Sequence, residues 1–114
     1  MSSLAAGVDA IEIDRVRKTL ARHPERFLRR VYTDLEVASC RGRVRELAVR
    51  FAAKEAVMKA LGTGVRGVAW REIEILPVRG GRPTVTLYRR ARERAEKLGL
   101  TGLAISLSHS KMLA

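Results

Sequence analysis

The segment from residue 43 to residue 61 constrains the fold more than any other part of the sequence. Its apolar side chains recur at spacings of three and four, which predicts a long amphipathic helix. They are Val44, Leu47, Ala48, Phe51, Val57, Met58 and Leu61. Gly62 follows at the position of a C-terminal helix cap. We therefore expect the rest of the chain to pack around this helix.

The other periodic segments are short. In chain order we expect a strand at 5–13, a helix at 14–22 that Asp14 caps and that ends before Pro24, a short turn at 25–32, strands at 71–76 and 84–88 joined by a turn at Gly80–Gly81, a helix at 89–98 and a last strand at 103–109. Thr33 and Glu36 have the spacing of a capping box, which marks a helix start. The chain length of 114 residues allows one domain. Together these features predict a single α+β domain, residues 1–114, in which a mostly antiparallel sheet packs on one long helix and shorter helices.

The charge of the chain is strongly positive. It has 23 Lys and Arg residues against 12 Asp and Glu, a formal net charge of +11. Residues 15–50 contain eleven basic and four acidic side chains, a net +7. Such a field attracts polyanions, which include nucleic acid, anionic lipid, a phosphorylated substrate and an acidic protein. On charge alone, a solvated arginine-rich surface is the simpler interpretation.

Composition argues against a membrane protein and favours the cytoplasm. No apolar run approaches the roughly 20 residues that span a bilayer. The first residues, Met1 to Leu4, lack the basic and apolar regions of a secretory signal. Cys40 is the single cysteine, so an internal disulfide cannot form, which fits a reducing cytoplasm.

Two acidic residues occupy positions where the pattern predicts an inward-facing side chain. Glu55 continues the apolar stripe of the long helix, and Asp9 shares one strand face with Ile11 and Ile13. A carboxylate on a core-facing stripe is costly unless a cation, hydrogen bonds or a proton compensates it. Two such acids, meeting where helix and strand pack, would suit Mg²⁺, which takes few protein oxygens and often binds phosphate as well. For each acid alone, a salt bridge to an arginine is the more ordinary explanation.

Basic and glycine-rich positions flank Glu55. Lys59 lies one helical turn later, where it can pair with Glu55 or reach a bound phosphate. The loop Gly62-Thr63-Gly64 offers backbone amides to a phosphate, and His109 could donate a hydrogen bond or take a proton. Each feature has a plain structural alternative, namely an exposed ion pair, an ordinary turn and a structural histidine.

Six segments of the sequence form one pattern through their order and spacing. They are Gly7-Val8-Asp9 with Glu12 and Arg15, Arg50-Phe51-Ala52-Ala53-Lys54-Glu55-Ala56, Lys59-Ala60-Leu61-Gly62-Thr63-Gly64, Ile73-Glu74-Ile75, Gly81-Arg82-Pro83 and Ser106-Leu107-Ser108-His109. This pattern resembles the holo-acyl-carrier-protein synthase type of 4′-phosphopantetheinyl transferase across almost the whole chain. That family continues with another apolar strand, so we expect its C-terminal strand to be missing from a chain that stops at Ala114.

The resemblance implies Mg²⁺-dependent transfer of 4′-phosphopantetheine from coenzyme A to a serine of apo acyl carrier protein, with release of adenosine 3′,5′-bisphosphate. It implies that Asp9 and Glu55 are the Mg²⁺ ligands and that Glu55 and Lys59 are catalytic. The implied coenzyme A site consists of Arg50, Lys54, Gly62, Thr63, Gly64 and His109. The implied docking surface for the acidic carrier protein consists of Arg15, Arg26, Phe27 and Arg30. The family forms homotrimers with a site at each subunit boundary, which we also expect here.

Two other functions compete with this interpretation. An arginine-rich nucleic-acid-binding module would explain the net charge through phosphate contacts. It leaves the two inward acids unexplained, and five aromatic residues supply little base stacking. A structural or assembly protein of the same fold would follow if the shortened C-terminus removed the site.

Overall fold

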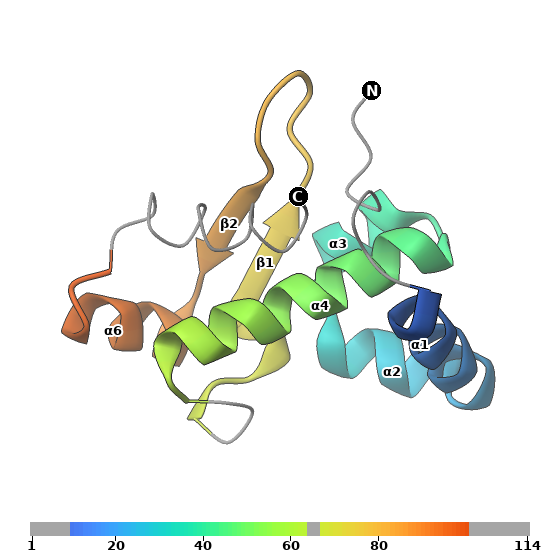
Figure 1. Ribbon diagram of the computed structural model, residues 1–114, viewed down its shortest axis with the longest axis horizontal. Coiled ribbons are helices and arrows are strands. Elements are labelled where there is room, and N and C mark those ends of the chain that lie inside the picture. The colour runs from blue at the N-terminus through green and yellow to red at the C-terminus, as the bar shows by residue number, and fades with distance from the viewer. Residues whose placement is uncertain (1–9, 64–66, 101–114) are drawn as a thin grey trace.

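The computed structural model describes residues 10–63 and 67–100 of the chain. In chain order these residues form α1 Ala10–Arg22, α2 Pro24–Val31, α3 Asp34–Cys40, α4 Val44–Leu61, the 3₁₀ helix η1 Trp70–Glu72, β1 Ile73–Leu76, β2 Thr84–Leu87 and α6 Arg89–Lys97 (Figure 1). Helices combined with an antiparallel strand pair confirm the predicted α+β class. Within these ranges, every helix is too short or too polar to cross a bilayer.

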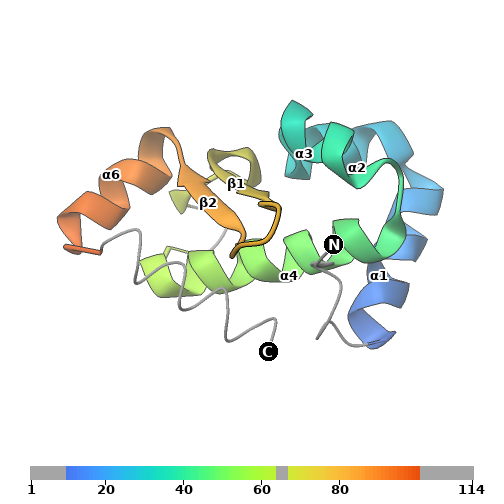
Figure 2. The same cartoon turned by 90° about the horizontal axis from the view of Figure 1, so that it is seen from above.

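The predicted long helix, α4, runs through the middle of the molecule (Figure 1). Helices α1, α2 and α3 lie toward its N-terminal half, and the hairpin and α6 lie toward its C-terminal half (Figure 2). The helix ends at the predicted cap, Gly62, whose φ of 70° is left-handed. The Gly62 amide donates to the carbonyls of Met58 and Lys59. Glycine suits this position because it has no Cβ to oppose a left-handed backbone.

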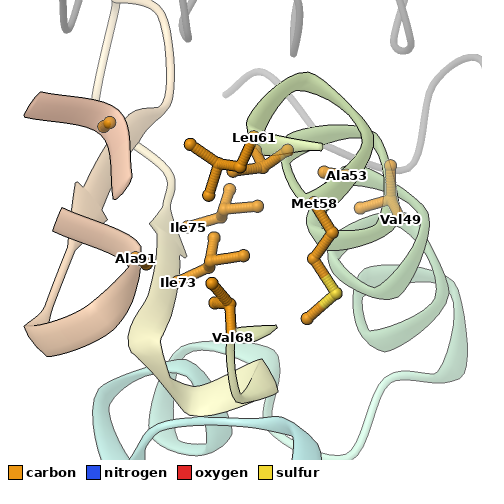
Figure 3. Packing of buried hydrophobic residues seen from close by; sticks show 10 residues of the cluster. Val49, Ala53, Met58, Leu61, Val68, Ile73, Ile75 and Ala91 are labelled. Carbon is orange, nitrogen blue, oxygen red and sulfur yellow. The ribbon is translucent and has the colours of Figure 1, made fainter. Parts of the chain in front are cut away.

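The C-terminal half of α4 packs on β1 and α6 through a cluster of buried side chains (Figure 3). Its members are Val49, Ala53, Val57, Met58, Leu61, Val68, Ile73, Ile75, Ala91 and Ala95. These side chains are aliphatic apart from the Met58 thioether, and the two alanines bring α6 close to the strands. This cluster holds the C-terminal end of α4 in a fixed position.

The N-terminal half of α4 packs on α1 and α2 through a second cluster. Its members are Ile13, Val16, Phe27, Val31, Tyr32, Cys40, Leu47 and Ala48. Most of the scarce aromatic side chains gather here. Phe27 lies 5.6 Å from Tyr32 and 6.0 Å from Phe51 between ring centroids, and Phe51 stacks on Trp70 at 4.7 Å. Trp70 packs against both clusters and so joins the two halves of the core.

β1 and β2 form the predicted antiparallel hairpin, with Ile73 opposite Leu87. β1 is buried, whereas β2 alternates between exposed and half-buried positions. In the turn, the Gly81 amide donates to the Val78 carbonyl at 3.1 Å. The hairpin is therefore confirmed, but residues 71 and 72, predicted as strand, belong to η1. The predicted last strand at 103–109 lies outside the described residues.

The predicted strand at 5–13 is wrong from Ala10 onward, because α1 already begins there. Ile11 and Ile13, which a strand would place on one face, lie about 200° apart around a helix. Accordingly, Ile11 is 80% exposed and Ile13 is 9% exposed. Alternation in a short apolar segment does not distinguish strand from helix, and packing on the second cluster favours the helix here. Residues 5–9 lie outside the described residues.

Local signals predict other helix ends correctly. α1 ends before Pro24, which takes the first position of α2, where a missing N–H costs nothing. Asp14, by contrast, is not an N-cap: it lies inside α1 and pairs with Lys18 at 3.1 Å. The capping box forms as predicted, because the Thr33 hydroxyl accepts from the Glu36 amide and the Glu36 carboxylate accepts from the Thr33 amide.

Candidate functional site

Glu55 lies on α4, the helix against which α1 packs. Its side chain is 39% exposed, so the prediction that it faces the core is wrong. The buried face of α4 instead carries Arg50 and Lys54, both 0% exposed. Apolar residues lie on nearly every side of α4, and their spacing therefore did not define a single inward face.

Arg15 reaches from α1 to Glu55. Its Nη2 atom lies 3.4 Å from Oε1 of Glu55 and 3.3 Å from Oε1 of Glu12. Its guanidinium carbon lies 5.2 Å from the centroid of the Phe51 ring, which is within the range of a cation–π contact. One partly exposed guanidinium thus joins two carboxylates on an aromatic support.

One of the two predicted Mg²⁺ ligands, Glu55, lies within the described residues. Its carboxylate fits the role, because it is half-exposed and is paired with a partly exposed guanidinium rather than enclosed in the core. The other, Asp9, lies outside them, immediately before the first residue of α1. Across residues 10–63 and 67–100, no three His, Cys, Asp or Glu side chains form a group that could hold a metal ion. Mg²⁺ commonly uses only one or two protein carboxylates, so a pair such as Asp9 and Glu55 matches its ordinary requirement.

The C-terminal end of α4 presents two cationic side chains. Lys59 is exposed on the last helical turn. Arg94 of α6 donates from Nε to the Leu61 carbonyl at 2.9 Å, and its guanidinium lies beside Gly62. These cations partly offset the negative end of the helix dipole and leave the region attractive to an anion.

The loop after α4 contains a polar group that the described residues leave unsatisfied. The Thr63 hydroxyl oxygen is buried and makes no hydrogen bond in the part of the chain that the structure describes. A Cβ atom on Gly67 would approach the Thr63 Cβ to 2.8 Å, so glycine at this position allows residue 67 to lie close to Thr63. The other predicted ligand-binding positions, Gly64 and His109, lie outside the described residues.

Lys54 and Arg50 were expected to line the coenzyme A site, and their burial corrects that expectation. The Lys54 ammonium donates to Glu36 Oε1 at 2.6 Å, to the Val31 carbonyl at 2.7 Å and to the Trp70 carbonyl at 3.1 Å. Its three donors are therefore used inside the protein. Lys54 joins α4 to the end of α2, to α3 and to η1.

Arg50 is similarly enclosed. Its guanidinium donates to the Ile75 carbonyl at 3.0 Å, to the carboxylate and carbonyl of Glu46, and to the Ser39 hydroxyl. These bonds connect α4 with β1 and α3. Both basic residues of the motif therefore position the helices that carry the site and do not lie in its wall.

Burial shifts the pKa of three groups in this region, namely Lys54, Tyr32 and Cys40. Burial lowers the pKa of Lys54 from its ordinary value, and the Glu36 carboxylate opposes this shift. Burial also raises the pKa of the Tyr32 hydroxyl, and it raises the pKa of the Cys40 thiol to about 11. The sequence indicated only a capping role for Glu36, because no local signal points to a partner 18 residues away.

Three of the four predicted docking residues are accessible. Arg15, Arg26 and Arg30 are exposed on α1 and α2. Phe27 is not, because its ring is 9% exposed and packs in the second cluster. A surface depression of about 360 Å³, lined by Glu25, Arg26, Arg29 and Arg30, lies along α2. The accessible arginines agree with an anionic partner, whereas the prediction that Phe27 contacts it is wrong for this conformation.

A larger cavity, of about 890 Å³, lies between η1, the end of β2 and the start of α6. None of the predicted site residues lines it. Its four arginines are Arg71, Arg89, Arg90 and Arg92, of which three pair with carboxylates of Asp34, Glu72 and Glu96. Carboxylates therefore compensate most of the positive charge that lines this cavity.

Comparisons with known proteins agree with the motifs. Residues 5–108 match the sequence profile of the 4′-phosphopantetheinyl transferase superfamily. The holo-[acyl-carrier-protein] synthase of Moorella thermoacetica is 53% identical over 109 residues, which cover 93% of this chain and 84% of that protein. The corresponding protein of Herpetosiphon aurantiacus is 46% identical over 114 residues, with 94% and 90% covered.

Solved structures show the same fold. Helicobacter pylori holo-[acyl-carrier-protein] synthase in complex with coenzyme A superposes with a TM-score of 0.66 at 28% identity, covering 76% of this chain and 74% of that chain. Plasmodium yoelii acyl carrier protein synthase with ADP bound gives a TM-score of 0.65 at 30% identity, covering 78% and 72%.

Proposed function

The chain belongs to the 4′-phosphopantetheinyl transferase superfamily and is a transferase, and we propose that it converts apo acyl carrier protein to the holo form. It transfers 4′-phosphopantetheine from coenzyme A to a carrier-protein serine and releases adenosine 3′,5′-bisphosphate. One observation carries this proposal, namely the 53% identity to a holo-[acyl-carrier-protein] synthase over 93% of the chain. The accessible carboxylate of Glu55, which pairs with the exposed Arg15, supports it.

In the proposed reaction, the serine hydroxyl oxygen forms a bond to the phosphorus that carries pantetheine, and the bond from that phosphorus to the leaving bisphosphate breaks. Glu55 accepts the serine proton, for which its half-exposed carboxylate is accessible. Asp9 and Glu55 are the proposed Mg²⁺ ligands, and Mg²⁺ would supply neutralisation of the pyrophosphate charge. Lys59, exposed one turn after Glu55, neutralises charge that grows on the phosphate oxygens.

The loop after α4 is the proposed binding site for the phosphates of coenzyme A. The amides of Gly62 and Thr63 already donate to carbonyls in the last turn of α4, so Gly64 is the proposed backbone donor. Gly62, which has no side chain, lets a phosphate approach the loop closely, and a ligand oxygen would satisfy the buried Thr63 hydroxyl. His109 completes the proposed site. Arg50 and Lys54 are not included, because their donors are used within the protein.

The proposed protein substrate is an acidic carrier protein that docks on Arg15, Arg26 and Arg30. Long-range attraction between opposite charges accelerates encounter and makes it sensitive to salt. We further propose a cytoplasmic homotrimer in which each site lies at a boundary between subunits. The nucleic-acid alternative is not favoured, because four of the five aromatic rings pack against one another in the protein.

A mass-shift assay tests the proposed function. Apo acyl carrier protein, coenzyme A, Mg²⁺ and the purified protein are incubated, and we expect the carrier protein to gain the mass of one phosphopantetheine group. Glu55→Gln should abolish the gain while thermal unfolding stays unchanged, because the substitution removes a charged ligand at nearly constant volume. No gain with the wild-type chain would reject the function, and full activity of Glu55→Gln would reject the role of that residue.

A further inference from the structure

Arg15 connects the proposed docking surface with the proposed catalytic carboxylate. It lies on α1 among the exposed arginines, yet its Nη2 atom also contacts Glu55 of α4 at 3.4 Å. Within residues 10–63 and 67–100, neither Arg26 nor Arg30 forms an ion pair with Glu55. A partner carboxylate that takes the Nη2 donors of Arg15 would therefore displace Glu55 from them.

The ion pair between Arg15 and Glu55 can break with little loss of stability. The side chains of Arg15 and Glu55 are 54% and 39% exposed, and ion pairs of this exposure contribute little to stability. Arg15 can therefore leave Glu55 without unfolding of the surrounding structure. Pairs such as Lys54 and Glu36, which are fully buried, cannot exchange in this way.

The support under Arg15 is rigid. The guanidinium lies over the Phe51 ring, and Phe51 stacks on Trp70 with an interplanar angle of 17°. The Trp70 carbonyl in turn accepts a hydrogen bond from the buried Lys54 ammonium. Glu12, one turn before Arg15, gives the guanidinium a second carboxylate at 3.3 Å. The side chain can thus remain on its aromatic support while its contact with Glu55 changes.

We propose that Arg15 is a positioning residue that pairs with Glu55 in the free protein and transfers its contact to the acidic carrier protein on docking, which leaves the Glu55 carboxylate unpaired for the reaction. This inference rests on the proposed function and adds a coupling between its two sites. Coupling of this kind is reciprocal, so loss of the Glu55 charge must strengthen carrier-protein binding through Arg15.

A double-mutant cycle on carrier-protein affinity tests the coupling without turnover. The ligand is apo carrier protein whose acceptor serine is replaced by alanine, and binding is measured by calorimetry in EDTA. We expect Glu55→Gln to bind it about two- to fivefold more tightly than the wild type, the range expected for an exposed ion pair. We expect Arg15→Gln to weaken binding, and the double variant Arg15→Gln/Glu55→Gln to bind no more tightly than Arg15→Gln.

Asp14→Asn is the matched control, because it removes one negative charge from α1 at a residue that pairs with Arg17 and Lys18. If Asp14→Asn and Glu55→Gln tighten binding equally, or if Glu55→Gln tightens it equally without Arg15, the effect is general electrostatics and the inference is overturned. Unchanged affinity of Glu55→Gln for the carrier protein overturns the inference as well. In that case the proposed function still stands if the wild-type protein transfers phosphopantetheine in the mass-shift assay. Failure of every variant to bind the carrier protein rejects both.

Discussion

Lys54 is fully buried, although lysine is among the residues least often found in a protein interior. Its ammonium is tolerated because Glu36 and two backbone carbonyls accept all three of its hydrogen bonds. Glu36 is equally enclosed, since it also accepts from the amides of Thr33 and Ile75. A buried pair of this kind tolerates the loss of both charges better than the loss of one.

Replacement of Lys54 therefore tests its structural role. Lys54→Met leaves the Glu36 carboxylate buried without its cation, and we expect the free energy of unfolding to fall by about 3–5 kcal/mol. The double variant Lys54→Met/Glu36→Gln should recover part of that loss. Lys59→Met, at an exposed position of the same helix, should change stability by no more than about 0.5 kcal/mol. Urea denaturation measures all three, and equal stability of the two lysine variants would contradict the assignment.

Among the helices, α6 begins in an unusual way. Its N-cap, Tyr88, makes no capping hydrogen bond through its side chain, and Arg89 has a positive φ of 48°. The Glu72 carboxylate of η1 serves the helix end instead, accepting from the amides of Arg90 and Ala91 at 2.7 and 3.2 Å and from the Arg90 guanidinium at 2.9 Å. Burial alone would raise the pKa of Glu72, but these bonds and the Ala69 amide outweigh it and the pKa is lowered.

This lowered pKa predicts a pH-dependent contribution of Glu72 to stability. The contribution is complete above the unfolded value, about 4.3, and is lost as the pH falls through the folded value. We expect Glu72→Gln to be less stable than the wild type by about 1–3 kcal/mol at pH 7, because a charged acceptor of several bonds is lost. The difference should shrink below pH 4 in urea denaturation curves. Asp34→Asn, at a fully exposed carboxylate, is the control, and a difference that is constant with pH would contradict the assignment.

At the scale of the whole structure, the proposed docking and catalytic residues occupy different positions along α4. The exposed arginines of α1 and α2 lie at one end, and α6 with the hairpin lies at the other (Figure 1). Glu55 lies between them on α4, one turn before Lys59. A net charge of +11 acts at long range on any acidic partner, but only the docking end is expected to make close contacts with it.

Charge reversal at the two ends distinguishes local docking from the long-range field. Arg30→Glu should weaken binding of the carrier protein by at least about tenfold, the effect of roughly 1.4 kcal/mol, and leave coenzyme A affinity unchanged. Arg92→Glu, an exposed position of α6, changes the net charge equally and should weaken binding much less. Titrations at two salt concentrations measure both effects. Equal losses in the two variants, or equal loss of both ligands, would show that the docking surface lies elsewhere.

The sequence was sufficient to predict those features that depend on a few neighbouring residues. The span of α4 follows from apolar spacing, and the positions of Gly62, Pro24 and the Thr33–Glu36 box follow from backbone preferences that a few neighbouring residues set. The hairpin also follows, because alternation on both sides of a glycine turn determines its pairing. The motifs around Glu55 likewise indicated the correct family.

The burial of individual side chains could not be predicted from such local signals. The segment from Ala10 is helical because its apolar side chains pack on α4, and Phe27 is a core residue because Tyr32 and Phe51 surround it. Lys54 is inside and Glu55 is at the surface because Glu36, 18 residues earlier in the chain, supplies the charge that makes burial of an ammonium possible. Whether a charged side chain faces solvent depends on the partners that folding brings to it from distant segments. The residues next to it in the sequence do not identify those partners.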